Sequence, residues 1–518
     1  MKAVFLTAFL LLCPALASAD PCAPLALVDD LAKVAPSARV KAALECIETL
    51  DRSGPTLQSV LAVDPNAARR ASQMDTTRAI GPLWGMPILV KDNIAVAGLS
   101  TTAGSRVLSD NVAATDAPLI AQLRKNGLVI LGKANLSEWG NIRGSRSIGG
   151  WSTLGGQTRY PYALDRSPDG SSSGSAVAVA AGIVPLAIGT ETDGSITHPA
   201  SVNGIVGLKP TVGLVSRKGI IPISSTQDTA GPMARSVRDA ALLLDAMTTL
   251  DPDDPRARKP VVRGRSYAAN LRVSALDGAR LGVMRWIDTG NPEVESLFRR
   301  ALADLERAGA ILIDLNEAPD PRIDDAEFVV LMTELKAGLD QYLAATPAAV
   351  RVKSLDDVIA ANRQDQRALS LFGQQLFERA ASTRGLEDPV YIEARALASR
   401  LAGEDGLDRM IAEHRLDALV GPTSALARPI DPAGASIGVG RGANRLPAVA
   451  GAPHLTVPMG QVHGLPVGLS IIGPAWSEQR LLEFGYAYEQ RTHHRRAPTY
   501  PQSILDRADI AAALARDR

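Results

Sequence analysis

The fold is decided by the stretch Ser167-Pro-Asp-Gly-Ser-Ser-Ser-Gly-Ser175 and by the segments that run from it to Gly189-Thr-Glu-Thr-Asp-Gly-Ser-Ile-Thr-His-Pro-Ala200. A Gly/Ser-rich stretch taken alone is typical of a flexible linker. However, the small residues of Ala176-Val-Ala-Val-Ala-Ala-Gly182 predict a closely packed helix, and Val184-Pro-Leu-Ala-Ile188 predicts a buried strand. We therefore expect an ordered loop, and the backbone amides at the start of such a helix are suited to holding an anionic oxygen.

Segments further along the chain alternate in the same way. Leu281-Gly-Val-Met-Arg285 and residues 311–315 predict strands, and residues 292–308 predict an amphipathic helix with proline at its start. The 518 residues are 46% hydrophobic and 21% charged, and their formal net charge is zero. This composition is that of an ordinary globular protein and argues against a nucleic-acid or polybasic membrane role. The sequence predicts an α/β fold without a linker or an internal repeat.

Lys91 lies upstream in Pro87-Ile-Leu-Val-Lys-Asp-Asn93, directly after an apolar run that predicts a buried strand. Burial would lower the pKa of the lysine because it disfavours the ammonium form, and a neutral lysine can accept a serine proton. The alternative is a surface lysine whose stem covers apolar neighbours. Together with Ser171 and Ser195, Lys91 indicates a serine hydrolase with a lysine base.

The sequence gives little support for a histidine base, for other serine hydrolase motifs, or for a nucleotide or metal site. His198 is the only histidine near Ser195 in the sequence, and triad partners are usually brought together by the fold rather than by the sequence. Gly-x-Ser-x-Gly does not surround Ser195, and no Ser-x-x-Lys occurs. Residues 127–134 partly match the phosphate-binding motif Gly-x4-Gly-Lys-Ser/Thr. However, the four residues between its glycines predict an apolar strand, and Ala134 stands where the motif has Ser or Thr. Cysteines and histidines are not spaced as metal ligands, so we expect no metal and no cofactor.

These blocks, taken together, resemble the amidase signature family, whose members hydrolyse amide bonds with a Ser-Ser-Lys triad. The resemblance extends from about residue 57 to residue 498. It also includes Thr101-Thr-Ala-Gly-Ser105, Asn203-Gly-Ile-Val-Gly-Leu-Lys-Pro-Thr211 and Gly464-Leu-Pro-Val-Gly-Leu-Ser-Ile-Ile-Gly473. Within the family, Glu191-Thr-Asp-Gly-Ser195, Gly219-Ile-Ile-Pro-Ile-Ser224 and Gln227-Asp-Thr-Ala-Gly-Pro-Met233 are most similar to peptide amidases, which remove ammonia from C-terminally amidated peptides.

The resemblance implies the amidase signature fold, a mixed central β-sheet surrounded by α-helices. It makes Ser195 the nucleophile, Ser171 a proton relay held by a cis peptide bond, and Lys91 the final base. It also implies an oxyanion hole formed by the backbone amides of four residues: Thr192, Asp193, Gly194 and Ser195. Such preorganised donors stabilise the charge that develops in the transition state.

The chain departs from the family pattern at several positions. Asp169 and Ser173 stand where the family loop has glycine, and Asp193 replaces a frequent glycine beside the nucleophile. Thr197 stands where many members have arginine, and Tyr160 where asparagine is common. The Asp193 side chain must either point away from the oxyanion or join the substrate pocket. These departures concern the substrate more than the chemistry.

The beginning of the chain predicts export. Residues 1–19 have the features of a signal peptide: the basic Lys2, the apolar run 4–12 and the small residues Ala17-Ser-Ala19 before a cleavage site. The mature chain would then begin at Asp20, and the protein would be periplasmic or secreted. No later segment has 18 uninterrupted apolar residues, so we expect no stable membrane anchor.

Two further segments flank or interrupt the expected domain. Residues 20–56 predict an N-terminal helical segment in which Cys22 and Cys46 form a disulfide in an oxidising compartment, the alternative being two buried free thiols. Residues 57–518 form the expected amidase domain. Within it, residues 325–410 have a charged helical pattern, which indicates either an insertion around the cleft or a solvated helical face.

Three functions remain at this point. The first is an exported amidase that acts on the C-terminal amide of peptides or on small aliphatic or aryl amides. The second is a glutaminase subunit that supplies ammonia to a transfer-RNA partner, whose cytoplasmic setting conflicts with the signal segment. The third is a non-catalytic periplasmic binding protein, which would tolerate loss of Lys91, Ser171 and Ser195, whereas this chain keeps all three.

Overall fold

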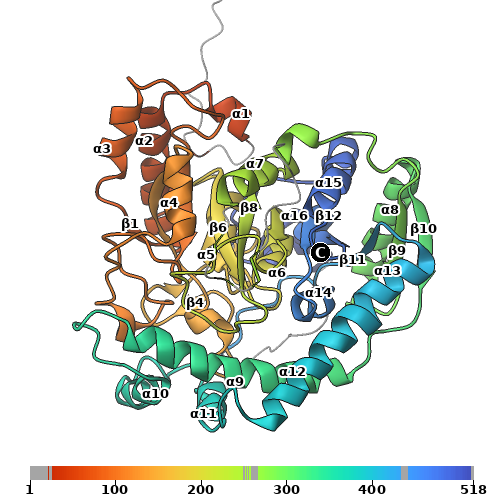
Figure 1. The fold of residues 1–518 in the computed structure, drawn as a ribbon. Helices are drawn as coiled ribbons and strands as arrows, with labels where there is room; N and C mark the ends of the chain where they lie inside the picture. Colours follow the sequence, from red (N-terminus) through yellow and green to blue (C-terminus); the bar gives the residue numbers. More distant parts are fainter. Residues whose placement is uncertain are drawn as a thin grey trace, which may run out of the picture.

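The computed structural model describes residues 22, 26–248, 251–252, 254, 256–257, 266–432 and 442–514, and the expected signal segment 1–19 lies outside them. The α/β fold is confirmed: a large mixed sheet occupies the centre and helices surround it (Figure 1). The strands are β1 (Val60–Val63), β2 (Pro87–Lys91), β3 (Val129–Ala134), β4 (Trp151–Ser152), β5 (Gly156–Gln157), β6 (Leu186–Glu191), β7 (Val206–Lys209), β8 (Thr229–Ala234), β9 (Arg280–Met284), β10 (Ile311–Leu315), β11 (Ala418–Pro422), β12 (His454–Val462) and β13 (Leu465–Ile472).

The central sheet has 11 strands in the order β1-β3-β2-β6-β8-β7-β12-β13-β11-β9-β10, and β4 and β5 form a separate pair. Strands β3, β2 and β6 are parallel, as are β11, β9 and β10, and antiparallel strands join these two groups. All residues of β2 and β6 are buried, as is usual where helices cover both faces of a parallel sheet. The sheet therefore provides a rigid base for the residues at the ends of β2 and β6.

The helices pack on this sheet and around its edges. The α-helices are α1 (Val28–Leu31), α2 (Pro36–Cys46), α3 (Ala67–Met74), α4 (Pro118–Lys125), α5 (Ser173–Ala180), α6 (Thr197–Val202), α7 (Val237–Met247), α8 (Pro292–Arg307), α9 (Arg322–Ala344), α10 (Leu355–Gln364), α11 (Gln375–Ala381), α12 (Pro389–Ala402), α13 (Arg409–His414), α14 (Arg445–Val449), α15 (Glu478–Thr492) and α16 (Ala508–Leu514). Short 3-10 and π turns are η1 (Ile47–Arg52), η2 (Arg106–Leu108), η3 (Glu138–Asn141), η4 (Ala268–Asn270), η5 (Gly403–Asp408) and η6 (Ile504–Asp506).

Helix α5 is built only from Gly, Ser, Ala and Val and is completely buried against β6 and β2. The helix begins three residues earlier than the small-residue pattern alone predicts, because Ser173 and the following glycine already belong to it. The Gly/Ser-rich stretch is therefore not a linker. It leads directly from the loop at Ser171 into the core.

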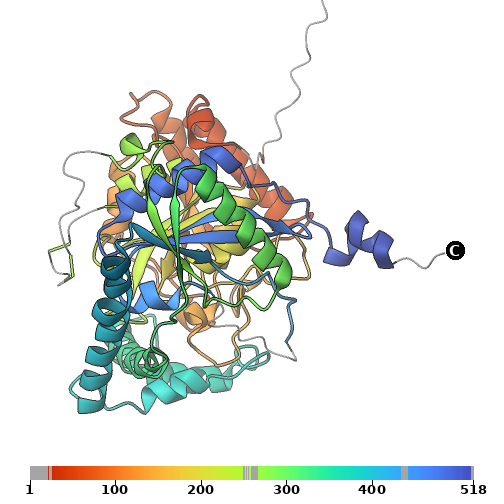
Figure 2. The same ribbon diagram turned by 90° about the vertical axis from the view of Figure 1, so that its right-hand side faces the viewer.

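Helices α9, α10, α11 and α12 form a helical layer along one side of the molecule, below the sheet in both views (Figures 1 and 2). Buried Glu334 of α9 anchors this layer, because its carboxylate accepts hydrogen bonds from Ser224 Oγ at 2.5 Å, Thr226 N at 3.0 Å and Tyr391 Oη at 2.8 Å. This part of the chain is thus held against the loop that precedes β8. Whether the layer is an insertion relative to the family stays a prediction.

The described N-terminal part of the chain lies at the edge of the sheet that β1 forms, next to β3. Cys22 and Cys46 are both buried and are joined in a disulfide with their Cα atoms 5.5 Å apart. At the other end of the chain, α16 projects from the body of the molecule (Figure 2). Among the described helices, none is long and apolar enough to cross a membrane.

Candidate active site

Lys91 ends the buried strand β2 and is almost inaccessible to solvent. Its Nζ lies 2.8 Å from Ser171 Oγ, 2.9 Å from Thr190 Oγ1 and 3.1 Å from the Thr190 carbonyl oxygen. Burial lowers the pKa of Lys91 to about 7, although the carboxylates of Glu191 and Asp228 act in the opposite direction. A neutral amine has two N–H donors and one lone pair. The two Thr190 oxygens match the donors, so the lone pair is left for Ser171.

Ser171 lies in the loop between the cavity and α5. The peptide bond between Gly170 and Ser171 is cis. The Ser171 carbonyl oxygen accepts a hydrogen bond from Ser137 N at 3.1 Å, and the neighbouring Ser172 N donates to the Ser195 carbonyl oxygen at 3.1 Å. The two serine-containing loops are therefore held together by their backbones.

Ser195 lies in the tight turn between β6 and α6. The buried Glu191 carboxylate shapes this turn by accepting hydrogen bonds from Ile196 N at 2.6 Å and Thr197 N at 2.9 Å. Gly194 has a φ of +79°, a left-handed conformation that favours glycine. Within the described chain, the N–H groups of Asp193, Gly194 and Ser195 have no hydrogen-bond acceptor, so they are available to an oxygen of a bound molecule.

Asp193 joins the wall of the cavity through a charged network from distant parts of the chain. Its carboxylate accepts a hydrogen bond from Asn444 Nδ2 at 2.5 Å and lies 3.1 Å from Arg445 Nε. Arg445 also lies 2.5 Å from the buried Glu327 carboxylate of α9. Burial, reinforced by the nearby Asp193 carboxylate, raises the pKa of Glu327. Arg445 therefore links the turn at Ser195 to the helical layer.

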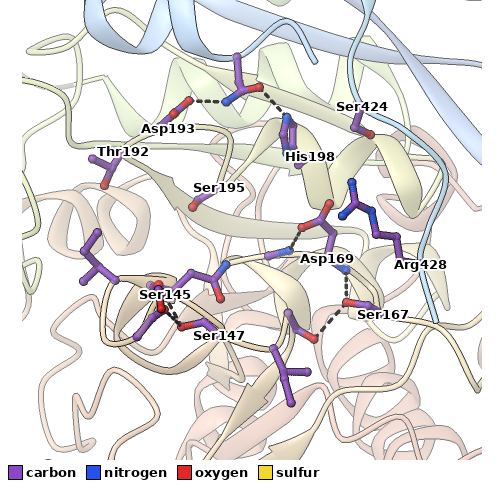
Figure 3. A pocket seen from close by; sticks show the side chains of 18 of the residues that line it. Ser145, Ser147, Ser167, Asp169, Thr192, Asp193, Ser195, His198, Ser424 and Arg428 are labelled. Carbon is purple, nitrogen blue, oxygen red and sulfur yellow. Dashed lines mark hydrogen bonds between the residues drawn. The ribbon is translucent and has the colours of Figure 1, made fainter. Parts of the chain in front are cut away.

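His198 is engaged away from the serines. Its Nε2 lies 2.9 Å from Asn444 Oδ1, so Asn444 connects His198 to Asp193 (Figure 3). His198 belongs to α6, and this hydrogen bond fixes its ring on the cavity wall. It gives the ring a structural partner other than Ser195.

The two family glycine positions that are replaced here have local roles. Asp169 has a φ of +61°, and its Oδ1 accepts a hydrogen bond from Gly170 N at 2.7 Å. Ser173 Oγ donates to the Asp169 carbonyl oxygen at 2.6 Å. Asparagine and aspartate tolerate the left-handed conformation better than other residues with a Cβ, which explains how Asp169 fits. Both replacements stabilise the loop that carries Ser171.

A cavity of about 490 Å³ opens beside Ser195 (Figure 3). Its polar lining includes Asp169, Asp193, His198 and Arg445. The apolar lining comes from the loops around Ser195 and from the helical layer: Ile142, Ile148, Phe328, Leu331, Met332, Leu376, Leu426 and Ile430. Pockets of this size that combine an apolar wall with a few polar groups are typical of small-molecule and peptide sites.

The chemical groups gathered beside this cavity are a buried amine, two hydroxyls and the backbone amides of the turn at Gly194. Such a set is suited to nucleophilic acyl transfer. No group of three or more His, Cys, Asp or Glu side chains is placed to hold a metal ion within the described residues.

The sequence predicts that Lys91, Ser171 and Ser195 form one site. In the structure Lys91 Nζ lies 2.8 Å from Ser171 Oγ, and Ser171 and Ser195 line the same small cavity. The sequence did not identify Arg445, Asn444 or Glu327. Neither Arg445 nor Asn444 belongs to a recognisable motif, and Glu327 fits the pattern of an ordinary solvated helix. The only signal for these residues is contact across about a hundred residues or more, which a single sequence does not contain.

Comparison with known proteins shows the family. The sequence model of the family described as Amidase matches residues 41–482, so the chain belongs to the amidase signature family and is an amidase hydrolase. A probable amidase of Arabidopsis thaliana is 37% identical over 88% of this chain and 87% of its own length. A putative amidase of Arthroderma benhamiae is 35% identical over 89% of this chain and 80% of its own length.

Among solved structures, the chain is similar to native peptide amidase from Stenotrophomonas maltophilia. The two share 48% sequence identity with a TM-score of 0.87, over 92% of this chain and 99% of that chain. A peptide amidase in complex with the competitive inhibitor chymostatin has the same identity and coverage and a TM-score of 0.88. An amidase family protein from Bacillus anthracis is 35% identical with a TM-score of 0.83, over 92% of each chain.

Proposed function

We propose that this chain is an exported serine amidase that hydrolyses the C-terminal carboxamide of peptides to a carboxylate and ammonia. Ser195 is the nucleophile, Ser171 the proton relay and Lys91 the final base. The observation that carries this proposal is the hydrogen bond of 2.8 Å between Lys91 Nζ and Ser171 Oγ, buried behind a serine that lines an open cavity. No metal or cofactor takes part in the proposed reaction.

The reaction begins when Ser195 Oγ attacks the amide carbon and passes its proton to Ser171 Oγ, while Ser171 passes its own proton to Lys91 Nζ. The C–O bond forms, and the carbonyl oxygen becomes an anion that the N–H groups of the turn around Gly194 stabilise. Such a donor is worth about 3–4 kcal/mol of transition-state stabilisation. The protons then return through Ser171 to the leaving nitrogen, the C–N bond breaks, and ammonia leaves an acyl-enzyme. Water hydrolyses this ester by the same route.

The proposed preference for peptides is supported by the cavity of about 490 Å³ beside Ser195. Ammonia is a small leaving group, so recognition must come from the acyl side of the amide. An apolar wall with the ordered polar groups of Asp193 and Asn444 suits a side chain and backbone amides of an extended peptide. The likeness to peptide amidases at 48% identity, one of them bound to a competitive inhibitor, supports this choice over small aliphatic or aryl amides.

Ammonia release tests the substrate. We expect kcat/KM to be higher for a C-terminally amidated dipeptide than for a free aliphatic amide, with no cleavage of internal peptide bonds. This ratio reports differential binding of the transition state. A preference for a short aliphatic or aryl amide would leave the amidase chemistry in place and discard the peptide assignment.

Export is tested separately by mass spectrometry of secreted protein. The proposal expects an N-terminus at Asp20 after removal of the segment 1–19, which carries a basic start, an apolar run and small residues before the cleavage site. A retained leader in correctly exported protein would contradict the proposed cleavage.

A further inference from the structure

A second, much smaller cavity lies beside the same serines. It measures about 20 Å³, and Ser171, Ser195 and Thr190 are among the residues that line it. Leu335 and Leu339 of α9 line it as well. A cavity needs about 10–15 Å³ to hold one water molecule, so this one accommodates a single molecule of the size of water or ammonia.

Two polar groups of the wall lack partners. Asn93 Nδ2 donates to Thr190 Oγ1 at 2.9 Å, but Asn93 Oδ1 has no hydrogen-bond partner in the described chain. Trp139 Nε1 likewise has none among the described residues. Both residues are more than nine-tenths buried and line the small cavity. Since an unpaired buried polar group costs free energy, an unpaired acceptor and an unpaired donor on residues that line this cavity favour a small polar molecule as its occupant.

The backbone around Trp139 is held in an unusual shape. Trp139, Gly140 and Asn141 have φ values of 53°, 67° and 71°, all in the left-handed region. For a residue as bulky as tryptophan this conformation is strained and persists only when its surroundings enforce it. Here Trp139 N donates to the Ala103 carbonyl oxygen at 2.9 Å, and the indole packs edge-on against Phe377 with ring centroids 5.5 Å apart. A Cβ at Gly140 would lie 3.7 Å from Ser171 Oγ, so this loop directly adjoins the relay serine.

We propose that the small cavity is the leaving-group site of the reaction: it receives the NH₂ group of the carboxamide, holds the ammonia, and then admits the water that hydrolyses the acyl-enzyme. Asn93 and Trp139 position this molecule, and Leu335 and Leu339 limit its size. This inference rests on the proposed roles of Ser195, Ser171 and Lys91. It identifies the residues that make the enzyme selective for unsubstituted amides.

Asn93 Oδ1 and Trp139 Nε1 are an acceptor and a donor that suit both ammonia and water. Asn93 Oδ1 accepts one N–H of the amide, which turns the nitrogen lone pair toward Ser171 as the C–N bond breaks. After proton transfer from Ser171, the lone pair of free ammonia accepts from Trp139 Nε1. Water can likewise donate one hydrogen bond to Asn93 Oδ1 and accept one from Trp139 Nε1, so it can replace ammonia. As the water oxygen bonds to the acyl carbon, its proton passes to Ser171, and Ser171 passes its own proton to Lys91. The protons then return through Ser171 to Ser195 Oγ as the bond between that oxygen and the acyl carbon breaks.

The test compares a C-terminal primary amide of a peptide with its N-methyl amide. One extra methyl group in a pocket costs about 10- to 200-fold in kcat/KM, and the wild-type enzyme should show at least this preference. Leu335→Ala and Leu339→Ala open the wall, so each should reduce the preference at least about tenfold. Leu343→Ala is the matched control, because Leu343 is buried on the same helix but does not line the cavity.

Trp139→Phe tests the polar role without emptying the wall. We expect a lower kcat on the primary amide with little change in KM, since the indole N–H acts on the leaving nitrogen and not on the acyl side. The dependence of kcat/KM on pH should keep its limb near pH 7, because Lys91 is untouched. A purely structural role would change KM and thermal stability together.

The outcomes separate this inference from the proposed function. If the wild type releases ammonia and Ser195→Ala does not, the catalytic roles stand. An unchanged preference in Leu335→Ala and Leu339→Ala, equal to that of Leu343→Ala, would then overturn the leaving-group site alone. If Ser195→Ala stays active, the catalytic roles fail first, and the inference fails with them.

Discussion

The sheet-borne site and the helical layer would contribute to the proposed reaction in different ways. Lys91, Ser171 and Ser195 lie on strand ends and loops of the buried sheet and are surrounded by short sequence motifs. The layer α9–α12 contributes apolar side chains such as Phe328 and Leu335 and the buried carboxylates Glu327 and Glu334. Chemistry demands fixed residue types at fixed spacing, whereas recognition demands only a wall of the right shape. This difference explains why the residues of the sheet-borne site can be predicted from the sequence and those of the helical layer cannot.

The largest effect should follow from Ser195→Ala, which tests the sheet-borne region alone. We expect activity to fall by at least about 10³-fold because the nucleophile acts as a unit with its base. The thermal midpoint should change little, since the Ser195 hydroxyl has no hydrogen bond in the described chain. Ammonia release and calorimetry measure the two effects. Residual activity above a few per cent, with contamination excluded, would refute the assignment of the nucleophile.

Lys91→Ala should be nearly as severe, and Ser171→Ala somewhat less so because water can replace part of a relay. In the wild type, kcat/KM should rise as pH increases through about 7, where Lys91 loses its proton and becomes a base. The acid limb should disappear in Lys91→Ala. A flat profile in the wild type, measured where chemistry limits the rate, would contradict the role of Lys91. His198→Ala serves as the comparison, and a larger loss there than in Lys91→Ala would favour a histidine base.

Removal of Arg445, which links the sheet-borne site to the helical layer, should have an intermediate effect, and it should lower the free energy of unfolding. Arg445→Met leaves the carboxylates of Glu327 and Asp193 without their cation, and removal of one partner of a buried pair costs about 3–5 kcal/mol. The loss in unfolding free energy should shrink as pH falls, because burial raises the pKa of Glu327 and protonation neutralises its stranded carboxylate. Chemical denaturation at pH 8 and pH 5 measures this.

Arg363→Met is the control for that prediction. Arg363 lies 2.9 Å from Glu378 in the same layer, but both side chains are about half exposed. Surface pairs of this kind contribute about 0–1 kcal/mol. Equal losses in the two variants would show that Arg445 is an ordinary surface charge and that the two regions are not linked through it.

The smallest effect on catalysis is expected at the disulfide, which lies in neither region. Replacing Cys22 and Cys46 by serine should lower the unfolding free energy by about 2–4 kcal/mol while leaving kcat/KM unchanged. Reductant should reproduce the loss in the wild type and have no effect on the double variant. A change in kcat/KM would show that the N-terminal segment reaches the active site.

The sequence predicted those parts of the fold that local patterns determine. The buried strand before Lys91 and the small-residue helix after Ser171 were predicted because burial on both faces requires uninterrupted apolar or small residues. The order of the strands was not, since it depends on pairing between distant segments. The role of Asp193 stayed open for the same reason: its partners Asn444 and Arg445 lie about 250 residues further along the chain.

The limit of prediction from the sequence is clearest in the helical segment 325–410. The charged pattern of residues 325–410 was compatible with a solvated face, yet Glu327, Glu334 and Met332 are buried in the structure. A charge pattern does not reveal which carboxylates will find a buried partner. Only the position of α9 against the sheet decides that.

Helix α9 is a single continuous rod from Arg322 to Ala344, and successive turns of it form walls of two different spaces. Phe328, Leu331 and Met332 border the large cavity, whereas Leu335 and Leu339 border the small one. If the large cavity takes the acid and the small one the amine, as proposed, selection for a bulkier acid and selection for a bulkier amine would act on neighbouring turns of one helix. The two halves of a new substrate would then be best optimised in one combined library.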